Sequence, residues 1–304
     1  MIAVAEGHRT DLQTTGTDAP AWATACLNCG TPLSGPFCAQ CGQNAAPPHP
    51  SVHELAHDAL EQFVHWDGKV GATLRCLIAH PGALTCDVLT GRRARYVSPL
   101  RLYLTCSVVY FLLSAAAPAT RVNFNVSVPS PGAGKVRVVG PGAQLTDNER
   151  AEAVASSDKM PRLLRQFAHR TIEDPSGLRR DMLQALPKVL FALLPVFAAV
   201  LALFYRRRRF VEHLYFALHL HAFIFIAMAI RPLLRFVPFP PLEFVAGIAV
   251  LVWIPVYAHV SFLRVYGSTH GITALKETGV SVLYGLASMP VLLATALWVA
   301  SHPH

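Results

Sequence analysis

Five long apolar segments constrain the fold of this chain more than any other feature. A helix needs about 20 largely apolar residues to cross a hydrocarbon core roughly 30 Å thick. The five segments cover residues 99–117, 183–205, 214–230, 242–262 and 280–300. The composition agrees, because 53% of residues are hydrophobic and only 14% are charged, against about 25% in soluble domains. We therefore predict a mainly α, polytopic membrane bundle with five transmembrane helices in contact with the lipid bilayer.

The basic residues predict how this bundle is oriented. Lysine and arginine near the ends of spans favour the cytosolic side. In a five-helix bundle three basic groups fall on one side: residues 92–95, residues 206–209, and Arg264 with Lys276. We expect a cytosolic N-terminus and an extracytoplasmic C-terminus, although Arg231 and Arg235 lie on the opposite side. The first twenty residues contain no apolar run of the signal-peptide kind, which agrees with this orientation.

The long segment between the first two spans, residues 118–182, predicts a small extracytoplasmic α+β segment. Residues 122–128 alternate between apolar and polar side chains, as in a half-buried strand. A turn rich in proline and glycine follows, and residues 136–139 could pair back as a hairpin. Residues 147–167 show a helical, amphipathic pattern.

Two Cys-x-x-Cys pairs near the N-terminus predict a metal site. Cys26 and Cys29 form the first pair, Cys38 and Cys41 form the second, and a glycine follows each pair. Zn²⁺ takes four thiolates in a tetrahedron, and tandem pairs of this kind are typical of a zinc ribbon. The alternatives are a redox dithiol or a disulfide pair, but a reducing cytosol favours the metal. We predict one structural zinc ion per chain.

The zinc ribbon is not expected to bind nucleic acid. Residues 20–50 contain no lysine or arginine that could contact phosphate groups. A cytosolic protein partner, or another part of the same chain, is the expected contact. The remaining cysteines, Cys76, Cys86 and Cys106, are expected to be ordinary packing residues.

His53, Glu54 and His57 match the H-E-x-x-H pattern of zinc-dependent hydrolases. On a helix the two histidines would face one way and the glutamate could act as a base. The surrounding segment of cytosolic chain is too short to enclose a water-excluding site. We therefore favour an ordinary amphipathic helix over residues 52–63 and keep the metalloenzyme as an alternative.

Four histidines fall in or beside predicted spans, and ionisable groups at membrane depth often mark functional sites. These are His213, His219, His221 and His259. Histidine can bind metals or relay protons. The alternative is a neutral histidine that is hydrogen-bonded between helices.

Three stretches of the sequence carry a resemblance to a known family. Residues 26–43 read C-L-N-C-G-T-P-L-S-G-P-F-C-A-Q-C-G-Q, and residues 80–100 read H-P-G-A-L-T-C-D-V-L-T-G-R-R-A-R-Y-V-S-P-L. Residues 186–197 and 212–223 read L-P-K-V-L-F-A-L-L-P-V-F and E-H-L-Y-F-A-L-H-L-H-A-F. The chain resembles a bacterial family of polytopic inner-membrane proteins that opens with a zinc ribbon and is catalogued as a domain of unknown function. The resemblance implies that architecture and location, and it implies no activity.

The predicted organisation has six parts: a disordered N-terminus over 1–24, the zinc ribbon over 25–45, a cytosolic amphipathic helical segment over 50–96, the first span over 97–117, the extracytoplasmic segment over 118–182, and the remaining spans over 183–304. Three functions are compatible with it. The favoured one is a non-enzymatic scaffold or accessory protein whose ribbon recruits a cytosolic partner. The others are a small-molecule or ion transporter that uses the four histidines, and a membrane metalloenzyme.

Overall fold

The computed structural model of the protein describes residues 24–45, 68–117, 125–128, 136–139, 147–237 and 239–302. Five helices in this part of the chain are long and apolar enough to cross a membrane. They are α4 (Pro99–Ala116), α7 (Pro175–Phe204), α8 (Phe210–Leu234), α9 (Pro240–Tyr266) and α10 (His270–Ser301). The mainly helical fold with five candidate spans is therefore confirmed. His53, Glu54 and His57, which form the H-E-x-x-H pattern, lie outside the described residues.

Several of the helices extend beyond the apolar runs that predicted them. Helix α7 has 30 residues and α10 has 32, which gives lengths of roughly 45–48 Å at 1.5 Å per residue. The start of α7 shows why hydropathy alone places its boundary too late. The Asp174 carboxylate accepts the backbone N–H of Gly177 at 2.8 Å, and Pro175 occupies the first turn. This cap begins the helix two turns before the chain becomes apolar.

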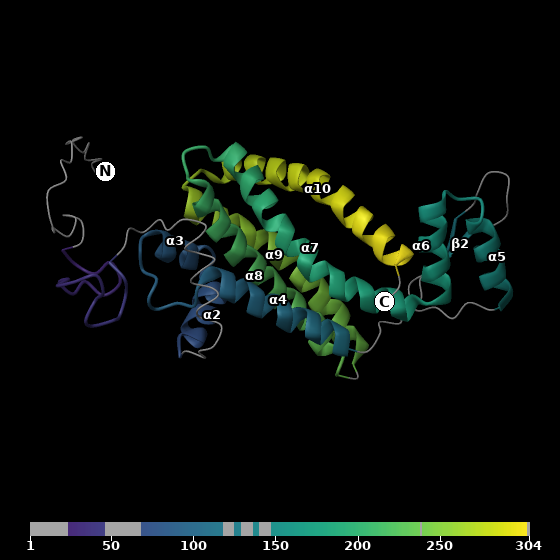
Figure 1. Cartoon of the computed structure of the whole chain (residues 1–304), viewed down its shortest axis with the longest axis horizontal. Coiled ribbons are helices and arrows are strands. Elements are labelled where there is room, and N and C mark those ends of the chain that lie inside the picture. The colour runs from purple at the N-terminus through teal and green to yellow at the C-terminus, as the bar shows by residue number, and fades with distance from the viewer. Residues whose placement is uncertain are drawn as a thin grey trace.

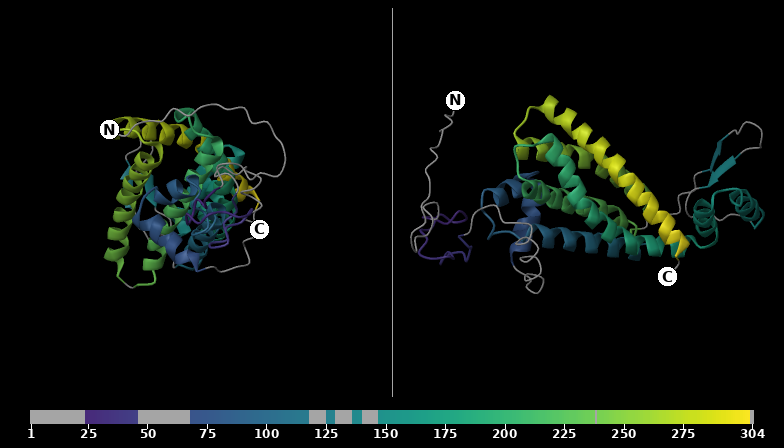
Figure 2. Two further views of the ribbon diagram at one scale, coloured as in Figure 1. Left: turned by 90° about the vertical axis from the view of Figure 1, so that its left-hand side faces the viewer. Right: turned by 45° about the horizontal axis from the view of Figure 1, so that its top comes forward.

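Helix α8 is the centre of the bundle. Of its most apolar 18-residue window, 67% is buried, against 6% for α10. Tyr103 and Phe111 of α4 pack their rings on Phe225 of α8, with centroids 5.5 and 5.9 Å apart. In Figures 1 and 2, α4, α7 and α9 lie around α8, while α10 crosses the outside of α7. Exposed apolar side chains on the outer helices, such as Leu275 and Leu286 of α10, are the surface that lipid would cover.

Two short helices, α2 (Lys69–Ala79) and α3 (Ala83–Leu89), dock against one end of the bundle. Tyr257 of α9 donates its hydroxyl to the carbonyl of Leu77 at 2.6 Å. Arg264, also on α9, donates to the carbonyl of Pro81 at 2.6 Å. Helix α9 thus holds the α2–α3 turn from two sides. We call this end, where α9 ends and α10 begins, the ribbon end.

The opposite end of the bundle carries a hairpin and two short helices, of which the second is strongly amphipathic. Strand β1 (Asn125–Val128) pairs antiparallel with β2 (Val136–Val139), so the predicted hairpin is confirmed. The helical pattern over residues 147–167 corresponds to two helices, α5 (Asp147–Ser157) and α6 (Arg162–Glu173), rather than one. The chain breaks at Pro161, which has an extended backbone and disfavours helix in the residue before it.

Helix α6 is tied to the ends of α7 and α10. The Arg170 guanidinium on α6 pairs with the buried carboxylate of Asp181 on α7 and donates to the carbonyl of Val299 on α10. The predicted segment 118–182 therefore ends inside α7, because residues 175–182 form the first two turns of that helix.

Candidate metal centre

The two cysteine pairs form matching knuckle turns. In the first, Gly30 donates its N–H to the carbonyl of Cys26 at 2.7 Å. In the second, Gly42 does the same to Cys38 at 2.8 Å. Both glycines have a left-handed backbone, with φ of 76° and 71°, which costs a residue without Cβ little. The spacing therefore turns both thiols of each pair toward one point.

The four sulfur atoms of Cys26, Cys29, Cys38 and Cys41 all lie within 4.8 Å of one another. The Sγ atoms of Cys26 and Cys41 are 3.6 Å apart, and those of Cys29 and Cys38 are 3.5 Å apart. Bonds of about 2.3 Å to a tetrahedral metal would separate sulfurs by about 3.8 Å. A disulfide would need about 2.05 Å, and the four cysteines are free. The arrangement suits a metal ion bound by all four.

The thiols differ in how readily they give up their protons. A hydrogen bond with the Thr31 side chain lowers the pKa of Cys29 to about 6. Burial raises the pKa of Cys26 to about 11, so this thiol keeps its proton at neutral pH until a cation displaces it. Because a metal binds the thiolate form, binding releases protons and metal affinity is expected to fall as the pH falls.

The ribbon is attached to the membrane bundle through one buried side chain, Gln43. Its Nε2 donates to the carbonyl of Gly91 at 2.7 Å. Its Oε1 accepts the backbone N–H groups of Arg93 and Ala94 at 3.1 and 3.0 Å. Residues 91–94 belong to the loop between α3 and α4, which we call the clamp loop. A single residue next to the second knuckle therefore satisfies three backbone groups of that loop.

Further contacts continue this attachment along the first knuckle. Leu27 lies so close to Gly91 that a Cβ at position 91 would approach its Cδ1 to 2.5 Å. Gly91 also has a positive φ of 91°, which disfavours any other residue. Arg95 donates to the carbonyl of Asn28 at 3.4 Å. Both knuckles thus contact the clamp loop, and the ribbon lies beyond α2 and α3 at the ribbon end of the bundle (Figure 2).

A Gln43→Ala variant is expected to release the ribbon while leaving the cysteines unchanged. The Arg93 N–H and the Gly91 carbonyl keep their bond to each other, whereas the part-buried Ala94 N–H loses its bond to Gln43. One such group costs about 1–3 kcal/mol when unsatisfied, which corresponds to a roughly 5- to 150-fold weaker docking equilibrium. Hydrogen exchange of the Ala94 amide would accelerate accordingly. Gln40→Ala is the matched control, because Gln40 is exposed on the same knuckle. Equal amide exchange rates in the Gln43→Ala and Gln40→Ala variants would contradict the attachment of the ribbon through Gln43.

Three of the four predicted histidines have neutral hydrogen-bond partners. The Nδ1 atom of His213 lies 2.8 Å from the hydroxyl of Tyr266. That of His219 lies 2.9 Å from the hydroxyl of Thr85 on α3. His221 donates from Nδ1 to the carbonyl of Ala217 on its own helix. These contacts join α8 to α9 and α3, so His213 and His219 fit the packing alternative.

His259 is different, because both of its ring nitrogens meet titratable groups. Its Nδ1 lies 2.9 Å from Oε2 of Glu277, and its Nε2 lies 3.2 Å from Nδ1 of His270. Neither partner was singled out from the sequence, since each gains its meaning only from the pairing of α9 with α10. The four histidines therefore do not share one set of partners, and the transport hypothesis stays a prediction.

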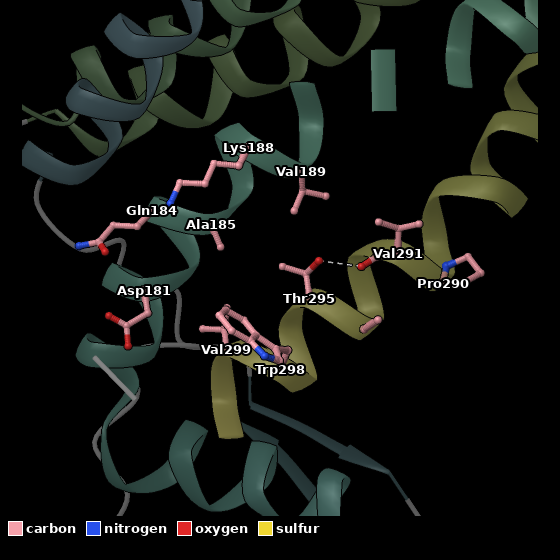
Figure 3. A pocket seen from close by; sticks show the side chains of 11 residues that line it. Asp181, Gln184, Ala185, Lys188, Val189, Pro290, Val291, Thr295, Trp298 and Val299 are labelled. Atoms are coloured by element: carbon pink, nitrogen blue, oxygen red, sulfur yellow. Dashed lines mark hydrogen bonds between the residues drawn. The ribbon is translucent and has the colours of Figure 1, made fainter. Parts of the chain in front are cut away.

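A groove of about 840 Å³ lies between α7 and α10, toward the end opposite the ribbon (Figure 3). Ala185 and Val189 of α7 face Val291 and Thr295 of α10 across it. The Thr295 hydroxyl donates to the carbonyl of Val291 on its own helix at 2.8 Å. The groove therefore offers mainly apolar surface, which in a bilayer would contact acyl chains.

One comparison with known proteins matches the α2–α4 region of the chain. Residues 67–111 match a family model described as a protein of unknown function (DUF3667). The match covers the docked helices α2 and α3, the clamp loop and most of α4, and it ends before α7. It includes the whole of residues 80–100, one of the stretches on which the sequence resemblance rests, and none of the others. No curated protein and no solved structure matches the chain.

Proposed function

We propose that the chain is a multi-pass protein of the bacterial inner membrane whose zinc ribbon is a docking platform for a cytosolic protein. The zinc assignment rests on the four-thiolate set, because Zn²⁺ is the common ion for closed sites of this kind. A closed site has no open position for substrate, so we assign the ribbon no catalytic role. The clamp loop would hold the platform in a fixed orientation on the membrane bundle.

The charge distribution supports a cytosolic ribbon end. The ribbon contacts the clamp loop, which carries Arg92 and Arg93 beside Arg95, and the four arginines 206–209 lie between α7 and α8 at the same end. Arg231 and Arg235 at the other end oppose this orientation. Both lie near one carboxylate, that of Glu243, at 3.6 and 2.9 Å, so they add less positive charge than their number suggests. On this basis we place the C-terminus outside the cytosol.

The observation that favours a protein partner is the exposed ring of Phe37. It is 61% exposed on the loop that leads into the second knuckle, although the docked ribbon buries Gln43 only six positions later. Large aromatic side chains are enriched in protein interfaces and depleted elsewhere on surfaces. With no lysine or arginine over residues 20–50, this surface suits an apolar protein contact rather than nucleic acid.

A photo-crosslinking residue in place of Phe37 tests the proposal in cells. Illumination is expected to join the chain to a soluble cytosolic protein, and a Cys29→Ser, Cys41→Ser background should abolish the adduct because the ribbon loses its metal. The matched control places the same residue at Ser34, which is exposed in the same loop. No adduct from position 37, or equal adducts from both positions, would overturn the proposal.

A further inference from the structure

A hydrogen-bonded chain of three titratable side chains joins α9 to α10. The imidazole of His259 on α9 lies between Glu277 and His270 of α10, 2.9 Å from the Oε2 of the carboxylate and 3.2 Å from the Nδ1 of the second ring. The two imidazole centroids are 5.5 Å apart. Each nitrogen of His259 therefore meets a different partner.

The chemistry of the partners fixes which atoms carry protons. An ionised Glu277 can only accept, so Nδ1 of His259 must be the protonated nitrogen. In a neutral ring Nε2 of His259 is then an acceptor, and Nδ1 of His270 must donate to it. This leaves Nε2 of a neutral His270 as the free basic nitrogen. Both imidazoles thus direct an N–H donor toward the Glu277 side of the hydrogen-bonded series.

The three hydrogen-bonded side chains run from the end of the bundle inward, from His270 through His259 to Glu277. His270 is the first residue of α10 and is exposed, and α10 begins at the ribbon end of the bundle (Figure 1). Glu277 lies seven positions further along α10, which is about 10 Å along the helix axis. Its side chain is 19% exposed, and that of His259 is 27% exposed. An ionisable residue within a spanning helix commonly marks a functional site.

The groups that face Glu277 come from α10 and from the end of α7. Tyr205 directly follows the last residue of α7 and lies within electrostatic reach of Glu277. The ammonium of Lys276 lies 4.5 Å from the centroid of the Tyr205 ring. The Tyr205 hydroxyl is buried and has no hydrogen-bond partner in the described part of the chain. The Tyr205 phenol and the Lys276 ammonium thus lie beside Glu277, at the inner end of the hydrogen-bonded series.

We propose that His270, His259 and Glu277 form a proton relay that carries a proton from the ribbon end of the bundle to the Glu277 carboxylate. A proton from a buffer acid or hydronium ion binds Nε2 of His270. The Nδ1 proton of His270 passes to Nε2 of His259, and the Nδ1 proton of His259 passes to Oε2 of Glu277. One proton is taken up, both rings end neutral in the opposite tautomers, and Glu277 becomes a carboxylic acid.

This inference is independent of the proposed docking function, because it uses no residue of the ribbon or the clamp loop. A proton relay also differs from a hydrogen bond that only stabilises the packing of α9 on α10. Such a packing contact would need only the His259–Glu277 pair and would give His270 no part in protonating Glu277.

Time-resolved infrared spectroscopy of the full-length chain in lipid vesicles, after a downward pH jump, tests the relay. Because the other acidic residues also protonate, the Glu277 signal is the protonated carboxylic C=O band that remains after the Glu277→Gln spectrum is subtracted from that of the wild type. His270→Gln and His259→Asn should slow its appearance by about 100-fold, within the range of a lost proton-transfer group. The asparagine keeps an N–H donor for Glu277, so a fold that needs this bond survives.

His80→Gln is the matched control, because His80 is an exposed histidine at the same end of the bundle. It should leave the rate unchanged. Wild-type rates in both His270→Gln and His259→Asn would overturn the relay, since Glu277 would then be protonated directly. Identical spectra of the wild type and Glu277→Gln would also overturn it, because Glu277 would then not be the proton acceptor.

Discussion

Replacing Cys29 and Cys41 by serine is expected to unfold the ribbon and free the clamp loop. Structural zinc sites contribute about 10–16 kcal/mol of apparent binding free energy to folding at neutral pH, and these two residues supply half of the ligand set. The ribbon has almost no core apart from the metal site. Within residues 24–45, the buried residues are Cys26, Cys38 and Gln43. Without the metal, Gln43 has no fixed backbone from which to reach Gly91.

The expected signal is hydrogen exchange at least about 100-fold faster at the Ala94 amide, which donates to Gln43 in the docked ribbon. The rest of the bundle should keep its exchange rates, because the described spans pack without the ribbon. The matched control is a Ser34→Ala, Gln40→Ala variant, in which both changed residues are exposed on the ribbon. If the cysteine variant protected the clamp loop as the control does, the docking would not depend on the metal.

A Gly82→Ala variant is expected to loosen the α2–α3 pair from the bundle. Gly82 has a φ of 74°, and a Cβ there would lie 3.0 Å from both Cα and the carbonyl oxygen of Ser261 on α9. The left-handed backbone costs an alanine about 1–2 kcal/mol, and overpacking adds about 1–3 kcal/mol. The α9 backbone cannot move away, because Tyr257 and Arg264 hold the turn from either side. The variant should therefore lower the Tm in detergent by several degrees.

Gly71→Ala is the control, and we expect it to raise the Tm rather than lower it. Gly71 lies within α2, is exposed, and has open space where a Cβ would be added. Alanine there should stabilise the helix by roughly 0.5–1 kcal/mol. Equal Tm changes in the two variants would show that the close approach of Gly82 to Ser261 does not stabilise the fold.

The features that the sequence predicts well depend on local patterns. Each span follows from a run of apolar residues, because a bilayer selects for length and hydropathy alone. The knuckles follow from cysteine spacing and from the glycines at positions 30 and 42, whose positive φ the turn requires. The hairpin follows from strict alternation of apolar and polar residues.

The features that the sequence could not reveal depend on contacts between distant residues. Gln43 lies about fifty positions from the clamp loop that it binds, and no local pattern marks a buried glutamine. His259 was visible as a polar residue in a span, but its partners His270 and Glu277 become apparent only when α9 packs on α10. The early start of α7 was missed because a polar cap, rather than hydropathy, begins the helix.

We propose that one four-thiolate zinc site holds the ribbon on the membrane bundle. The decisive experiment measures zinc per chain in the detergent-purified wild type, in a Cys29→Ser, Cys41→Ser variant and in a His53→Ala, His57→Ala variant. We expect one zinc ion per chain in the wild type, which the cysteine variant loses and the histidine variant keeps. A wild type without zinc, or a zinc ion that remains in the cysteine variant and is lost in the histidine variant, would rule out this site.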